Sequence, residues 1–143
     1  MFKKLFVLVV TASLLAACGD SSQAVAPPPP PPQAPPSFMT FFELGSTALS
    51  DQSKNTIGQA AAVYKGKPST KVAVTGYADT VGAPAMNMQL SQRRADAVKA
   101  GLVAAGVPAA AITTAASGET SLLVSTGPQA KEPRNRRVVI SFN

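Results

Sequence analysis

Opposite charges flank a short loop near the middle of this 143-residue sequence. Asp79 stands in a glycine- and proline-containing stretch between an expected strand and an expected helix, and Arg93 and Arg94 fall in the second turn of that helix. A loop that leads into a helix N-terminus offers backbone amides and side chains to small charged groups. The spacing therefore predicts a shallow pocket suited to a zwitterion, a ligand that carries both an ammonium and a carboxylate.

Helical phase distinguishes the two arginines. On a wheel of about 100° per residue with Leu90 at zero, the apolar residues occupy a stripe from about −20° to about +120°. Arg94 falls at about +40° and Asn87 at about +60°, inside this stripe, whereas Arg93 lies at about −60°, at its edge. Burying an unpaired guanidinium costs several kcal/mol. We therefore expect Arg94 to meet a carboxylate, either that of a ligand or that of Asp79, in which case the pair would simply pin the loop to the helix.

The elements that position these charges alternate between strand and helix. Gly106 and Pro108 are expected to end the second helix, and Ser50 to cap the first. The order β-α-β-α-β-β predicts an α/β (α+β) two-layer sandwich, in which both helices cover one face of a mixed four-stranded sheet. Hydrophobic patterning places the strands at 38–42, 71–76, 112–117 and 137–142, and the helices at about 51–64 and 84–105.

Residues 1–17 have the pattern of an export signal. Lys3 and Lys4 precede the apolar run 5–15, which is too short to span a bilayer as a permanent helix. The sequence Leu15-Ala16-Ala17-Cys18 resembles the lipobox of bacterial lipoproteins, in which the signal is cut before the cysteine and Cys18 is lipidated. Because this is the one cysteine of the sequence, it has no disulfide partner, and a lipid anchor explains it. A plain signal peptide with an incidental cysteine is the alternative.

Residues 18–37 are expected to form a linker before the domain at 38–143. The prolines at 27–32, 35 and 36 fix φ and remove backbone donors, so the segment should extend as polyproline II over roughly 60 Å. A docking ligand for aromatic grooves is the alternative to a spacer.

Three separated blocks resemble one known domain family. They are Gly76-Tyr77-Ala78-Asp79-Thr80-Val81-Gly82, then Asn87 with Leu90-Ser91-Gln92-Arg93-Arg94-Ala95, and finally Asn135-Arg136-Arg137-Val138. These blocks look like the OmpA-like peptidoglycan-binding domain, and with the lipobox and linker the sequence is similar to peptidoglycan-associated lipoproteins. The resemblance implies a protein that is lipid-anchored in the cell outer membrane, with its domain facing the periplasm and binding peptidoglycan. Gly19, which is not an aspartate, favours the outer membrane in enteric sorting.

The resemblance also implies a ligand and the residues that hold it. The family's ligand is the diaminopimelate of the peptide stem, whose side chain carries an ammonium and a carboxylate. By resemblance Asp79 grips the ammonium and Arg94 the carboxylate, while Asn87 and Arg136 correspond to the family's loop asparagine and first distal arginine. Tyr77-Ala78 replaces the usual His-Thr, so part of the usual hydrogen-bond set is expected to come from backbone groups.

Composition narrows the remaining functions. The net charge of +6 suits an anionic partner. Nucleic acid is excluded as that partner, because the chain is expected to be exported and has no Trp and only two Tyr for stacking on bases. A wall hydrolase could use Asp79 and Glu119 as acid and base, but the sequence has no His and few carboxylates. We therefore expect a non-catalytic protein without metal or cofactor. The other alternative is a docking subunit, whose basic end Arg134, Arg136 and Arg137 and loop 118–135 would bind an acidic envelope protein.

Overall fold

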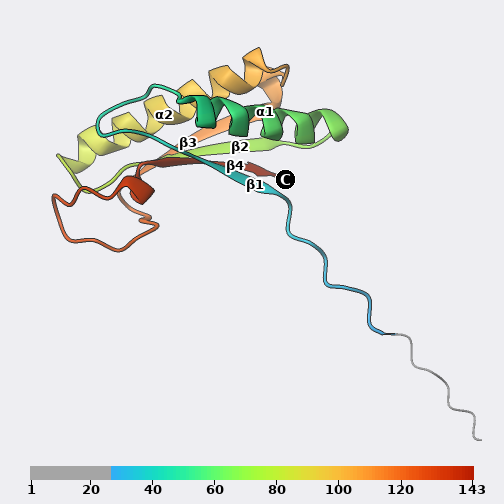
Figure 1. Cartoon of the computed structure of the whole chain (residues 1–143), viewed down its shortest axis with the longest axis horizontal. Coiled ribbons are helices and arrows are strands. Elements are labelled where there is room, and N and C mark those ends of the chain that lie inside the picture. The colour runs from blue at the N-terminus through green and yellow to red at the C-terminus, as the bar shows by residue number, and fades with distance from the viewer. Residues whose placement is uncertain (1–26) are drawn as a thin grey trace, which may run out of the picture. The chain divides into compact units, whose positions relative to one another are not determined.

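The computed structural model describes residues 27–143, and the domain within it begins at residue 33 (Figure 1). The predicted signal peptide 1–17 and the lipidation of Cys18 lie outside the described residues and stay predictions. Residues 27–36 form neither helix nor strand, in keeping with their prolines. Within 27–143, no helix combines the length and the apolar character needed to cross a membrane.

Residues 33–143 form two layers. The elements are β1 (Ser37–Phe41), α1 (Asp51–Gly66), β2 (Val72–Tyr77), α2 (Pro84–Ala104), the 3-10 helix η1 (Ala109–Ala111), β3 (Ile112–Gly118), the 3-10 helix η2 (Pro133–Asn135) and β4 (Arg137–Phe142). The sheet has the order β1-β4-β2-β3, in which β4 is antiparallel to both neighbours and β3 is parallel to β2. Both helices lie on one face of this sheet (Figure 1). The predicted α/β (α+β) sandwich with a mixed four-stranded sheet is therefore confirmed.

The hydrophobic core lies between the helices and the sheet. Alternate strand residues point into it, and α1 contributes Ile57, Ala60, Ala61 and Tyr64, which recur at three- and four-residue steps on one face. Every buried apolar side chain of the described residues lies between Phe42 and Phe142, so residues 33–143 contain the whole core and can fold on their own. The core includes Ile57, Ala60, Ala61, Tyr64, Val72, Val74, Val98, Leu102, Val138, Ile140 and Phe142.

The predicted helix ends are also confirmed. The Ser50 side chain accepts a hydrogen bond from the N–H of Ser53 at 3.1 Å and so caps α1. Beyond α2, Gly106 adopts a φ of 101°, which favours glycine, and the N–H of Val107 donates to the carbonyl of Leu102 at 3.0 Å. This is a Schellman ending, in which the side chains of Val107 and Leu102 are both buried.

Helix α2 lies very close to β2 at Gly76. A Cβ atom added there would come within 1.8 Å of the backbone oxygen of Ser91, so glycine alone fits. Ser91 also fixes α2 through its Oγ, which donates to the carbonyl of Met88 at 2.7 Å and accepts from the N–H of Gly118 at 3.0 Å. These contacts set the height of α2 above the sheet and thereby the position of Arg94, about one turn later.

We expect Gly76→Ala to lower the free energy of unfolding by at least about 3 kcal/mol, because the new methyl group meets backbone rather than a flexible side chain. Chemical denaturation followed by circular dichroism measures this change. Gly58→Ala is the matched control, since Gly58 is exposed within α1 and an added Cβ would meet no atom within 4 Å. The control should be stabilised by about 0.5–1 kcal/mol through helix propensity. Equal stability of the two variants would contradict the close contact.

Candidate ligand-binding site

Asp79 follows the end of β2 and is buried, with 3% of its surface exposed. Its Oδ2 accepts a hydrogen bond from Nη1 of Arg136 at 3.0 Å, and both side chains of this ion pair are almost fully buried. Its Oδ1 lies 3.4 Å from the N–H of Val81. The sequence predicted Arg94 as the protein partner of Asp79. That pairing is wrong, because β4 lies next to β2 and Arg136, the residue before β4, is placed beside Asp79.

Arg94 points into the domain, as its helical phase predicted, and has no exposed surface, whereas Arg93 is exposed. Its Nε donates to the carbonyl of Ser46 at 2.9 Å. Its Nη1 and Nη2 each donate at 3.1 Å, to the carbonyls of Tyr77 and Glu43. Backbone carbonyls, rather than a protein carboxylate, therefore hold this guanidinium within the described residues. The sequence did not predict these backbone partners of Arg94, because they lie in other elements of the chain.

The charges of Asp79, Arg94 and Arg136 act on one another. Burial lowers the pKa of Arg94 to about 10, the negative charge of Asp79 raises it, and the positive charge of Arg136 lowers it. Because this value lies well above 7, Arg94 stays charged at neutral pH. Since the pKa in the folded chain is below that in the unfolded chain, the buried charge opposes folding at neutral pH, and this opposition is relieved only as the pH rises through about 10. One carboxylate and two guanidiniums leave this charge cluster with a net positive charge.

Asn87, in the first turn of α2, ties two loops together. It is 4% exposed, and its Nδ2 donates to the carbonyl of Asp79 at 3.1 Å and to Oε2 of Glu119 at 2.7 Å. Glu119 directly follows β3. The structure therefore brings Asn87 next to Asp79, where its amide fixes the backbone of the loop after β2 against the loop after β3.

Hydrogen bonds of Gln129 and Thr80 attach loop 119–132 to the loop that contains Asp79. The sequence did not single out either residue for this role. Gln129 and Gly82 exchange hydrogen bonds: the N–H of Gly82 donates to Oε1 at 2.9 Å, and Nε2 donates to the carbonyl of Gly82 at 3.0 Å. The hydroxyl of Thr80 donates to the carbonyl of Gly127 at 2.7 Å. These contacts hold the backbone beside Asp79 in place. Neither residue carries a sequence signal, because their partners lie 47 positions away.

Arg137 has a different role from Arg136. Its guanidinium carbon lies 3.8 Å from the ring centre of Tyr77, its Nη2 donates to the carbonyl of Ser121 at 3.2 Å, and burial lowers its pKa. Arg136 and Arg137 are 7% and 6% exposed, so of the three arginines predicted for a basic docking surface only Arg134 lies at the surface. Arg134 is exposed, but its Nε lies 3.0 Å from Oε1 of Glu132.

Metal binding has no support in this region. In the part of the chain that the structure describes, no group of three or more His, Cys, Asp or Glu side chains could hold a metal ion. The candidate site is thus a cluster of one carboxylate and two guanidiniums, suited to a charged organic group rather than to a metal.

A model of the OmpA family matches residues 41–136, which contain Asp79, Asn87, Arg94 and Arg136. The protein belongs to the OmpA family. An outer membrane protein of Gluconacetobacter diazotrophicus is 38% identical over 110 residues, covering 73% of this chain and 29% of the relative. The peptidoglycan-associated lipoprotein of Pasteurella multocida is 43% identical over 82 residues, covering 57% of this chain and 55% of the relative.

A solved structure shares the fold of this OmpA-family domain. The crystal structure of the peptidoglycan-associated lipoprotein from Burkholderia pseudomallei matches with a TM-score of 0.69 at 25% identity, covering 74% of this chain and 90% of that one. The chain spans between 29% and 55% of the length of the two relatives above. The predicted family is confirmed, and membership fits a non-catalytic protein. The ligand-binding roles of the four site residues stay predictions.

We expect Asp79→Ala to lower the free energy of unfolding by about 3–5 kcal/mol, because it leaves the buried guanidiniums of Arg136 and Arg94 without a counter-charge. Combining it with Arg136→Met should restore part of that loss, since one unpaired charge is then removed. Urea denaturation of the single and double variants measures both effects. Asp51→Ala is the control, because the Asp51 carboxylate is 98% exposed, and it should change the free energy of unfolding by no more than about 0.5 kcal/mol. Parental stability of Asp79→Ala would contradict the buried ion pair.

Proposed function

We propose that this OmpA-family domain binds peptidoglycan non-covalently, through the zwitterionic end of diaminopimelate, and tethers the membrane to the cell wall. The observation that carries the proposal is the buried cluster of Asp79, Arg94 and Arg136 at the end of β2. Its net positive charge complements a ligand carboxylate. Oδ1 of Asp79, which has one long contact of 3.4 Å with Val81, is free to accept from a ligand ammonium.

Binding of the carboxylate requires the loop after β1 to move. Arg94 has no exposed surface, and two of its contacts are to carbonyls of Ser46 and Glu43 in that loop. When a ligand enters, its carboxylate oxygens replace these carbonyls on the guanidinium. The exchange is favoured because a hydrogen bond between two charged groups is stronger than one to a neutral carbonyl.

Relatives and the N-terminal sequence support a position for the domain in the cell envelope. Proteins named peptidoglycan-associated lipoprotein and outer membrane protein support an envelope location. A lipid on Cys18 would anchor the chain in the outer membrane, and the linker 18–37, roughly 60 Å long when extended, would let the domain reach peptidoglycan from the periplasmic face. A docking subunit is not proposed, because two of the three arginines on which it depended, Arg136 and Arg137, are buried.

We expect Asp79→Asn to reduce binding to purified diaminopimelate-containing sacculi by at least about tenfold, because the amide keeps an acceptor for Arg136 but cannot pair with an ammonium. Co-sedimentation of residues 33–143 with sacculi measures the loss, and circular dichroism checks the fold. Asp51→Asn is the matched control, because the Asp51 carboxylate on α1 is solvated, and this variant should sediment like the parent.

A second test of the same site changes the ligand instead of the protein. Sacculi whose stems carry lysine in place of diaminopimelate keep the ammonium but lack the adjacent carboxylate, so they should retain little of the domain. Equal sedimentation of Asp79→Asn and the parent, or equal binding to both kinds of sacculi, would overturn the proposed site.

A further inference from the structure

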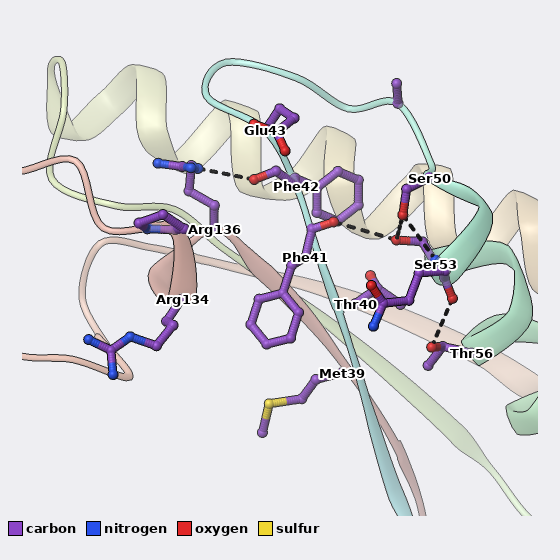
Figure 2. A pocket seen from close by; sticks show the side chains of 13 residues that line it. Met39, Thr40, Phe41, Phe42, Glu43, Ser50, Ser53, Thr56, Arg134 and Arg136 are labelled. Carbon is purple, nitrogen blue, oxygen red and sulfur yellow. Dashed lines mark hydrogen bonds between the residues drawn. The ribbon is translucent and has the colours of Figure 1, made fainter.

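A groove runs along the free edge of the sheet, beside the charge cluster. Strand β1 is an edge strand, and a cavity of about 420 Å³ lies between it, the start of α1 and the turn η2. This volume falls in the range of roughly 300–1,000 Å³ that small-molecule sites occupy. Figure 2 shows β1 running between Arg134 and Arg136 on one side and the hydroxyl side chains of α1 on the other. We call it the β1–α1 groove.

Neutral polar groups dominate the α1 side of this groove. Ser50, Gln52, Ser53 and Thr56 supply three hydroxyls and an amide. Thr40, on the β1 side, is 2% exposed, and its hydroxyl has no hydrogen-bond partner among the described residues. The hydroxyls of Ser50, Ser53 and Thr56 already donate within the domain, so their oxygens remain as acceptors. The side-chain amide of Gln52 and the hydroxyl of Thr40 are the groups that the domain's own contacts leave unused. The carboxylate in the lining is that of Glu43, in the loop after β1.

Two large apolar side chains and the strand edge complete the groove. Phe41 and Met39 lie side by side along β1 and are 45% and 42% exposed (Figure 2). The N–H of Phe42 donates to the carbonyl of Arg136 at 2.8 Å, so the alternation of an antiparallel pair turns the backbone groups of Met39 and Phe41 away from β4. One of these groups, the carbonyl of Phe41, accepts from Oγ of Ser53 at 3.4 Å.

This combination fits an acetylated sugar. A pyranose ring has an apolar face that packs against an aromatic side chain, and an acetamido group pairs with the backbone of an edge strand. The sugar hydroxyls donate to the Ser and Thr oxygens of α1 and exchange hydrogen bonds with the amide of Gln52. An anionic ligand is less well matched, because Arg136 is already paired with Asp79 and Arg134 with Glu132.

We propose that the β1–α1 groove binds an N-acetylated sugar of the peptidoglycan glycan strand, next to the stem held at Asp79. The inference rests on the proposed function. Arg136 joins the two sites, since its Nη1 donates to Asp79, its Nε donates to the carbonyl of Phe42 at 3.0 Å, and its side chain lines the groove. In peptidoglycan the stem is covalently attached to an N-acetylated sugar, so one fragment of the wall spans both sites.

Three ligands test this groove with residues 33–143: the diaminopimelate stem peptide alone, a disaccharide-linked stem peptide, and an N-acetylglucosamine tetramer. We expect the disaccharide-linked peptide to bind about tenfold more tightly than the stem alone. The tetramer should shift the NMR amide signals of 39–43 and 50–56 but not that of Asp79. Gln52→Ala and Phe41→Ala should remove the tenfold gain and leave the affinity for the stem peptide unchanged.

Matched controls come from exposed residues elsewhere on the domain. Gln89→Ala on α2 and Leu123→Ala in loop 119–132 should keep the tenfold gain. If the stem peptide binds but the disaccharide adds nothing and the tetramer shifts no groove signal, the sugar site is overturned and the proposed function stands. If the stem peptide fails to bind while the tetramer still shifts the groove signals, the proposed function fails and the sugar site stands. A tetramer that shifts signals outside the groove alone would also overturn the sugar site.

Discussion

A buried guanidinium holds the parts of the candidate site together. Arg94 has no exposed surface and donates to carbonyls of the loop after β1 and of the last residue of β2. Helix α2, that loop and the sheet therefore meet at one side chain. Desolvation makes this an unfavourable place for a charge, as the lowered pKa of Arg94 indicates. At such buried positions an apolar residue of similar volume often stabilises the fold equally well. The proposed ligand carboxylate would account for a charge at this position.

The other contacts of the site act on the backbone around Arg94 and Asp79. Asn87 fixes the carbonyl of Asp79, Gln129 holds Gly82, and Thr80 fastens loop 119–132. On this side hydrogen bonds hold the backbone of the site. The loop after β1 is attached through its carbonyls to Arg94. In the proposed function a ligand carboxylate would replace those carbonyls, so the buried charge would be reached from the side of this loop.

Local patterns in the sequence predicted most of the fold. The spacing of α1, the Ser50 cap, the glycine after α2 and the inward phase of Arg94 each depend on residues within a few turns of one another, and each is confirmed. What the sequence could not supply is the order of strands. Only when β4 is known to lie between β1 and β2 does Arg136 become the partner of Asp79. The β1–α1 groove is hidden for the same reason, because nothing local marks β1 as an edge.

Strand order also determines how the domain would respond to tension. The linker enters β1 at Ser37, while Phe42, just beyond the other end of the strand, adjoins the Asp79–Arg136 pair. A pull on the linker against a ligand held at that pair acts along the axis of β1. All hydrogen bonds between β1 and β4 would then be sheared together, instead of being opened one after another from an end. A short edge strand in this orientation resists force far better than its length alone would suggest, which would suit the proposed tether.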